Sequence, residues 1–352
     1  LRGLISASGC VDDGRIPSIL GTFAIRCYHK IPGVGPGHVK LGNAAIVALA
    51  ELPDLGGVAE LTRLRHKLKY ASARAKIDSQ LEWLSRAYGV SPDALMERAV
   101  PGFGLKQGGL RMSVGEGAVH LNVVSRRKVD LVWERADGMR IKSVPRALRA
   151  ADPDAVKEAR ALQRDVLTTL DGQCARVERL LYEDRTWTVA DWRAQYVDHP
   201  LIGLVARQLL WSVDGRTVLV GDDGPADVAG VSMMVPDSSQ VRLWHPVDAS
   251  AADIAAWRDR LDKLQLQQPF KQAWREVYLP TEAERRSVDH SDRFGSYLLR
   301  QQTFAALARE REWAFRLMGE WDSHNTPERQ LPDGGSATLD VSWVAGDSTE
   351  HM

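Results

Sequence analysis

A two-residue hydrophobic period runs from Val241 to His245 and predicts a short strand. Pro246 ends that strand, because proline has no amide hydrogen to donate to a sheet. A helical period follows, with Ser250 as the predicted N-cap and Asp253 three residues later as its capping partner. The buried face of this helix is predicted to carry Ile254, Trp257, Leu261 and Leu264.

A second helix is predicted to begin at Pro269, since the first turn of a helix tolerates proline. Its apolar face would carry Phe270, Trp274, Val277 and Tyr278. The same spacing leaves Lys271, Arg275 and Glu276 facing outward or into a cleft.

Residues 1–100 show helical periodicity interrupted by turns rich in glycine and proline. This pattern predicts stacked helix pairs, a helical-repeat segment like the end of an α-solenoid. Residues 101–150 change to short runs of alternating Val, Leu and Trp separated by turn residues, which predicts a small antiparallel β-meander.

The remaining residues, 151–352, are predicted to form a helical linker and a mixed α/β domain. One long helix should follow Asp152-Pro153 and extend over 151–184, and a helix pair is expected next, at 188–197 and 199–211. Beyond it, strands are predicted at 217–220, 230–235, 241–245, 313–321 and 339–343, with a helix at 294–311 and a surface loop at 322–335. Alternating strands and helices favour an α/β sheet in this domain. Because a helical segment and a separate β-meander come before it, the predicted fold class of the whole chain is α+β.

Composition narrows the class of protein. Lys plus Arg and Asp plus Glu number 46 each in 352 residues, so the net charge of zero gives no global attraction to nucleic acid or anionic membrane. The three cysteines, Cys10, Cys27 and Cys174, lack metal-ligand spacing and favour a reducing compartment. The longest apolar runs fall short of the ~20 residues of a membrane-spanning helix. We expect a cytoplasmic protein with no metal site, no cofactor and no membrane partner.

Four stretches carry a family resemblance: VPGFGLKQGG, DWRAQYVDHPL, WHPVDAS and QPFKQAWREVYLP. Together they resemble the MolR-like bacterial family called domain of unknown function 4132, over most of residues 37–313. Members of that family are usually much longer, with helical repeats before this region and often a WGR module, a small domain also found in poly-ADP-ribose polymerases. The resemblance implies that this chain, which opens on Leu1 and shows no WGR module, is a piece of a longer protein.

One candidate binding site is an anion clamp. Lys271 and Arg275, four residues apart with Glu276 beside them, could hold a phosphate or carboxylate, or could instead form an intramolecular ion pair. His199 and His245 each precede a proline at the end of an element, where an imidazole could act as a base or a ligand, or could simply bind backbone groups.

A second candidate is a basic stretch with no acidic residue from Leu61 to Ile77. It could bind a nucleic-acid backbone weakly and without sequence preference, or could be the solvated face of a helix. Its cations are Arg63, Arg65, Lys67, Lys69, Arg74 and Lys76.

The leading functional hypothesis is a non-catalytic interaction or regulatory module of a larger bacterial protein. Its partner would be another protein or another domain of the same chain, with a nucleic-acid connection implied by the WGR association of its relatives. The alternative hypothesis is an enzyme of unassigned activity that uses Lys271, Arg275, Glu276 and the two His-Pro sites.

Overall fold

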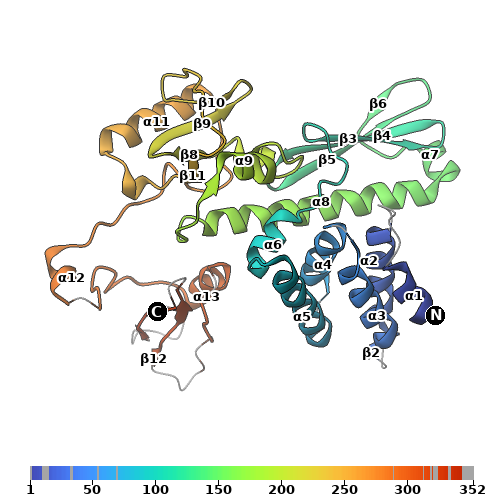
Figure 1. The fold of residues 1–352 in the computed structure, drawn as a ribbon, viewed down its shortest axis with the longest axis horizontal. Helices are drawn as coiled ribbons and strands as arrows, with labels where there is room; N and C mark the ends of the chain where they lie inside the picture. The colour runs from blue at the N-terminus through green and yellow to red at the C-terminus, as the bar shows by residue number, and fades with distance from the viewer. Residues whose placement is uncertain are drawn as a thin grey trace. The chain divides into compact units, whose positions relative to one another are not determined.

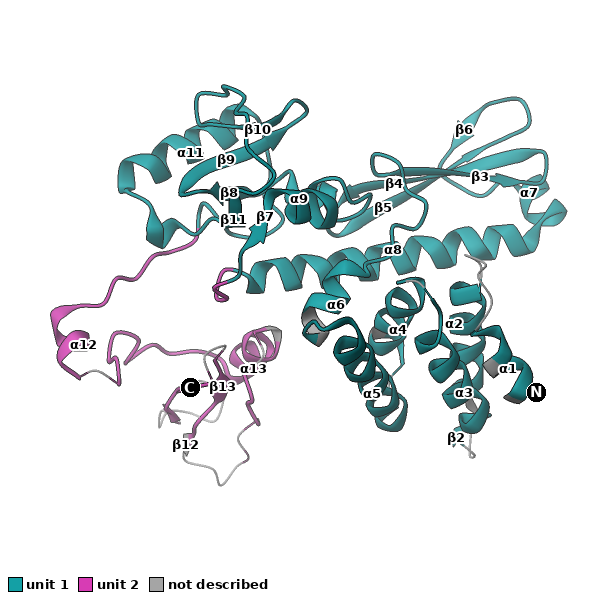
Figure 2. Ribbon diagram, viewed as in Figure 1, with its two compact units in different colours: residues 1–180, 185–274 teal, residues 181–184, 275–352 magenta. Residues whose placement is uncertain are grey.

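The computed structural model describes residues 2–9, 16–31, 35–53, 55–68, 70–287, 289–311, 313–317, 319, 324–331 and 334–342. The chain divides into two compact units, shown in separate colours in Figure 2. Unit 1 comprises residues 1–180 and 185–274, and unit 2 comprises residues 181–184 and 275–352.

The N-terminal part of unit 1 is a layer of helices, as predicted for residues 1–100. The helices are α1 (Arg2–Ser8), α2 (Ile16–Cys27), α3 (Val39–Ala50), α4 (Gly56–Lys67), α5 (Ala71–Tyr88) and α6 (Pro92–Arg98), with a short pair of strands, β1 (Lys30–Ile31) and β2 (Gly35–Pro36), between α2 and α3. Helices α3 and α4 approach closely at Gly57, which has no side chain. A Cβ atom at this position would lie only 1.9 Å from the Leu49 carbonyl oxygen. Buried residues such as Ile46, Leu61 and Ile77 form the core of this layer. A repeat architecture stays a prediction.

The predicted β-meander follows this layer. Its strands are β3 (Gly109–Val114), β4 (Gly117–Ser125), β5 (Lys128–Glu134) and β6 (Arg140–Ile141), paired antiparallel in chain order. Val119 lies opposite Trp133 and both are buried, as the alternating pattern predicts. This face of the sheet packs on the next helix.

That helix, α8 (Pro153–Arg179), follows the short helix α7 (Arg146–Ala151). The helix begins after Asp152, as predicted, and the Asp152 carboxylate caps it by accepting a hydrogen bond from the Ala155 amide at 3.0 Å. It ends earlier than predicted, at Arg179. Val156 and Ala159 pack against Trp133 of the meander. Figure 1 shows α8 running between the meander and the helices α1–α6.

The second half of unit 1 is built on a five-stranded antiparallel sheet of order β10-β9-β8-β11-β7. Its elements are β7 (Trp187–Thr188), α9 (Val189–Trp192), a π-helical turn (Arg193–Val197), α10 (Gly203–Ala206), β8 (Leu210–Val213), β9 (Arg216–Gly221), β10 (Gly224–Ala226), β11 (Gln240–Leu243), a 3₁₀ turn (Pro246–Asp248) and α11 (Ala251–Lys263).

Two predictions in this region are wrong. The segment predicted as a helix at 199–211 ends in β8, whose four residues are all buried and therefore show no alternation. The segment predicted as a strand at 230–235 has only an isolated bridge, from Ser232 to Ala226. The sheet predicted from the alternation of strands and helices is present, and its strands are antiparallel. Hairpins rather than crossover helices join β8, β9 and β10.

The described residues of unit 2 form α12 (Glu282–Ser287), α13 (Gln301–Glu310) and the short strands β12 (His324–Asn325), β13 (Glu328–Gln330), β14 (Ser336–Thr338) and β15 (Val341–Ser342). The helix predicted from 294 begins only at Gln301. The described residues of the strand predicted at 313–321 form a single bridge, from Ala314 to Glu328, and the predicted loop at 322–335 carries two of the strands. Trp321 and Trp343, expected on strands, lie outside the described residues.

None of the helices described here is both long and apolar enough to cross a membrane.

Helix α11 forms where the sequence pattern predicts it, with Trp257 and Leu261 buried, but the prediction that Leu264 is buried is wrong, because this residue caps the C-terminal end of the helix and is 44% exposed. The Ser250 hydroxyl accepts a hydrogen bond from the Asp253 amide at 3.1 Å, and Trp257 and Leu261 are buried against the sheet residues Leu210 and Leu219. We expect Trp257→Ala to lower the free energy of unfolding by ~3–5 kcal/mol, because it leaves a large cavity in the core. Urea denaturation measures this change. Leu264→Ala, at the exposed end of the same helix, is the control; an unchanged midpoint for Trp257→Ala would contradict the packing described here.

Candidate functional site

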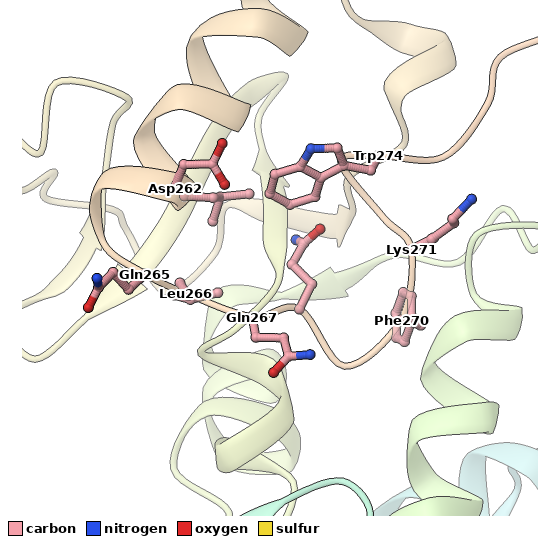
Figure 3. A pocket seen from close by; sticks show the side chains of 9 residues that line it. Asp262, Gln265, Leu266, Gln267, Phe270, Lys271 and Trp274 are labelled. Carbon is pink, nitrogen blue, oxygen red and sulfur yellow. The ribbon is translucent and has the colours of Figure 1, made fainter.

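The chain that follows α11 lines a hollow of about 540 Å³ within unit 1 (Figure 3). Its side chains include one carboxylate, Asp262, one ammonium group, Lys271, several glutamine amides and the rings of Phe270 and Trp274. In Figure 3 the Lys271 side chain extends away from Asp262 and Gln267 rather than into the hollow. The hollow therefore offers amide and aromatic contacts more than a focused charge.

The segment beyond Pro269 is not the predicted helix. The buried Gln272 side chain accepts a hydrogen bond from the Leu210 amide at 2.9 Å and donates to the carbonyl oxygens of Leu210 at 2.8 Å and Trp244 at 2.9 Å. The Gln268 amide binds Gln272 and accepts from the Ala273 amide, both within 2.9 Å. These bonds fix an irregular backbone, so tertiary contacts override the helical spacing of the apolar residues.

The three residues of the predicted anion clamp fall in different units. Lys271 belongs to unit 1, whereas Arg275 and Glu276 belong to unit 2. The Arg275 guanidinium donates to the Tyr182 hydroxyl at 2.7 Å, and the same guanidinium lies 5.5 Å from the centre of the Tyr182 ring. The clamp stays a prediction.

His199 and His245 share one local structure, in which the imidazole caps the turn that follows. The His199 Nδ1 atom accepts hydrogen bonds from the amides of Leu201 and Ile202, each at 3.1 Å, while Nε2 donates to the Val100 carbonyl at 2.9 Å. His245 Nδ1 accepts from the Val247 amide at 3.0 Å. In both motifs the following proline starts the turn and lacks a donor, so the imidazole replaces the usual Ser, Asp or Asn cap.

Acidic residues from outside the basic stretch reach several of its cations. Asp165 of α8 accepts from Arg63 at 3.0 Å and from Lys67 at 2.6 Å. Arg63 also pairs with Glu60, whose pKa is raised by burial although the bond to Arg63 opposes that shift.

The other cations of this stretch differ in their surroundings. Arg65 pairs with Asp78 at 2.6 Å, and Arg74 donates to the Leu68 carbonyl at 2.8 Å. Lys76 on α5 is half-buried, and Lys69 lies outside the described residues. Acidic residues outside 61–77, which the local sequence pattern does not include, therefore lie beside these cations in the folded chain. Nucleic-acid binding by this stretch stays a prediction.

A buried ionic cluster, which the sequence did not indicate, lies where α6 meets α8. Glu97 is 1% exposed and binds Arg185 and the Tyr196 hydroxyl, with Arg176 at 3.4 Å. Arg176 also donates to the Tyr196 oxygen at 3.0 Å and to the Gln173 oxygen at 2.7 Å. Burial raises the pKa of the Tyr196 hydroxyl, which therefore keeps its proton as a donor to Glu97. Within the cluster each charged group has an oppositely charged partner, although the second terminal nitrogen of Arg176, Nη2, is buried without a hydrogen-bond partner. This arrangement has the form of a structural joint rather than a catalytic centre.

Among the described residues there is no group of three or more His, Cys, Asp or Glu side chains placed to hold a metal ion.

The sequence profile of the family described as domain of unknown function (DUF4132) matches residues 138–313, half of the chain, and the chain belongs to this family. A relative is the uncharacterised protein YehI of Escherichia coli (strain K12), which is 27% identical over 241 residues. The match covers 64% of this chain and 20% of YehI, so the shared region spans about a fifth of that protein. No solved structure matches the chain.

The His199 cap predicts a pH dependence. Burial lowers the pKa of His199, and protonation of Nδ1 would remove the acceptor of two amide bonds. In the unfolded chain His199 titrates near its ordinary pKa of ~6.5, so the unfolded state takes up the proton first and stability is lost as pH falls through that range. We expect His199→Asn, which keeps a capping acceptor without a titrating group, to lose less stability than the wild type between about pH 7.5 and pH 5 in urea denaturation. Equal losses in the two proteins would contradict this assignment.

Proposed function

We propose that the chain is a non-catalytic interaction module of a longer, cytoplasmic bacterial protein. The observation that carries this proposal is a set of large apolar side chains on unit 2, each between 52% and 70% exposed. We call them the apolar surface: Tyr278, Leu279, Phe294, Tyr297 and Leu298. The rings of Tyr278 and Phe294 are in contact, and the other three residues lie within four positions of them in the sequence. Exposed apolar side chains gathered in this way are typical of surfaces that another polypeptide covers.

Local contacts give part of this surface a defined form. The rings of Tyr278 and Phe294 meet edge to face with 5.4 Å between their centres, and the Arg293 guanidinium lies 5.4 Å from the Tyr278 ring centre. Arg293 is held in turn by Glu284 at 2.6 Å and by the Leu279 carbonyl at 2.7 Å. An aromatic pair with an oriented arginine is the side-chain combination enriched at the energetic centres of protein interfaces.

The occupant we propose is another segment of the same longer protein. The region shared with YehI is 20% of that relative, in which most of the polypeptide therefore lies outside the shared region. The segment carrying the apolar surface lies inside the family match at 138–313, so docking through it would be a property of the family domain. A helical-repeat array or a WGR module, which the MolR-like resemblance implies, would be such a segment.

The enzyme and nucleic-acid alternatives have less support. Both histidines are used as turn caps, and Asp165 already binds two cations of the basic stretch. An enzyme would need Lys271, Arg275 and Glu276 to converge on one ligand. Nucleic-acid binding would need phosphates to compete with existing ion pairs.

Photocrosslinking tests the proposal. With p-benzoylphenylalanine in place of Tyr297 in the protein produced from its own gene, we expect an intramolecular crosslink to a peptide outside residues 1–352, identified by mass spectrometry. Phe294→Asp should abolish this crosslink, because a charge beside the rings opposes desolvation of the surface. The matched control places the same probe at Tyr88 of α5, a 46% exposed tyrosine of unit 1, and should give no such product.

Three results would contradict the proposal: no crosslink at position 297, a crosslink confined to residues 1–352, or a crosslink to a separate protein. An adduct that nuclease treatment removes would favour the nucleic-acid alternative instead.

A further inference from the structure

A second cavity, of about 250 Å³, lies in unit 1 where α4 faces α8. Neither the family match nor the proposed interaction surface accounts for it, and its walls come from segments about a hundred residues apart in the chain. Its lining residues include Arg63 and Lys67 of α4, Pro101 of the loop after α6, and Arg164, Thr168 and Gly172 of α8.

The glycine in this wall is unusual for its position. Gly172 lies inside the 27-residue helix α8, where glycine costs about 1 kcal/mol relative to alanine. Glycine in a helix is often required by a close neighbour, but a Cβ atom at Gly172 would have no atom within 4 Å. The missing side chain therefore keeps space open on the face of α8 that lines the cavity.

The charges around the cavity are unequal. Arg63 and Lys67 share the Asp165 carboxylate, and Arg63 also binds Glu60. Arg164 is a third cation in the lining, and it has no acidic partner within the described part of the chain. The three cations of the lining are thus balanced by Asp165 within the lining and by Glu60 beside it, which leaves one positive charge at the cavity, on the exposed side chain of Arg164.

Neutral polar groups and short apolar groups complete the walls. Thr168 and Thr169 present hydroxyl and methyl groups, and Pro101 presents its ring. The Gln173 side chain is buried and its oxygen is held by Arg176 at 2.7 Å, which leaves its amide hydrogens as donors. Such walls suit a ligand with a small apolar body and one charged end.

We propose that this cavity binds a small organic monoanion, a carboxylate whose charged end pairs with Arg164 and whose apolar body fills the space in front of Gly172. A planar guanidinium matches a carboxylate through two parallel hydrogen bonds, and the single unbalanced charge of the cavity matches one negative charge better than the two of a phosphate monoester. The volume lies just below the ~300–1,000 Å³ of pockets for drug-sized molecules, so the ligand is a small one. This inference is independent of the interaction surface on unit 2.

The probes that test it are benzoate, butyrate and the neutral analogue benzamide, titrated into the chain and followed by saturation-transfer NMR. We expect benzoate and butyrate to bind with Kd of about 1 mM or below. Benzamide should bind at least about tenfold more weakly than benzoate, because it lacks the charge that pairs with the guanidinium.

Two variants locate the site and one controls for charge. Arg164→Gln should weaken benzoate binding by about tenfold or more, since it removes a charge-assisted hydrogen bond. Gly172→Leu should abolish binding by filling the cavity, while raising rather than lowering the unfolding midpoint, because it replaces a helical glycine where space is open. Arg160→Gln, four residues earlier on α8 and outside this lining, should bind benzoate as the wild type does.

The proposal is overturned if neither carboxylate binds, if benzamide binds as tightly as benzoate, or if Arg164→Gln and Arg160→Gln behave alike. Undiminished binding by a folded Gly172→Leu variant would place the ligand elsewhere and would also overturn it.

Discussion

The architecture of unit 1 depends on the buried carboxylate of Glu97. This side chain comes from α6 of the N-terminal helical layer, and its partners come from α8, from the loop before β7 and from the π-helical turn: Arg176, Arg185 and Tyr196. A carboxylate that is 1% exposed would be very unfavourable without such partners, because burial strips it of water. The two guanidinium groups and the hydroxyl therefore have to stay in place together, and so do the elements that carry them.

A second carboxylate, on α8, pairs with cations of the helical layer. Asp165, three turns earlier, binds Arg63 and Lys67 of α4, so the helical layer is tied to α8 by ion pairs at two places. The cavity lined by Gly172 lies along this contact, between the two sets of charges. Charge pairing of this kind contributes less to stability than an apolar core would, but it fixes which faces of the helices meet. A contact fixed in this way can leave a small cavity open.

Three residues singled out in the sequence analysis or by the fold act in the same way on a smaller scale. His199, His245 and Gln272 bind backbone groups of segments that have no regular partner. The Gln272 amide joins the first residue of β8, Leu210, to Trp244, the residue that follows β11, in place of a further strand. The side chains of these residues thus form the hydrogen bonds that buried backbone groups would otherwise lack.

The sequence was informative wherever the determining contacts are local. The Ser250 cap, the start of α8 at Asp152-Pro153 and the alternation of the β-meander were all predictable from neighbouring residues. Tertiary contacts decided the failures. The segment after Pro269 has helical spacing but is held by Gln268 and Gln272, and β8 has no alternation because it is buried throughout.

The candidate sites were the least predictable part, because their charges come together only in the folded chain. Asp165 reaches the basic stretch from about a hundred residues away, and Glu97 meets Tyr196 across 99 residues of sequence. No periodic pattern marks either pairing. Gly172 was the one available signal for the cavity, a glycine inside an otherwise regular helical period.

A double-mutant cycle between Glu97 and Arg176 tests most directly whether the buried cluster holds the elements of unit 1 together. Glu97→Gln, Arg176→Met and the combination of both would be compared with the wild type by urea denaturation. If the buried cluster joins the helical layer to α8, each single variant should cost ~3–5 kcal/mol by leaving a buried charge without its partner, and the double variant should cost at least ~2 kcal/mol less than the sum of the two. Additivity within ~0.5 kcal/mol would show that the two side chains do not act together and would contradict the central role given to Glu97.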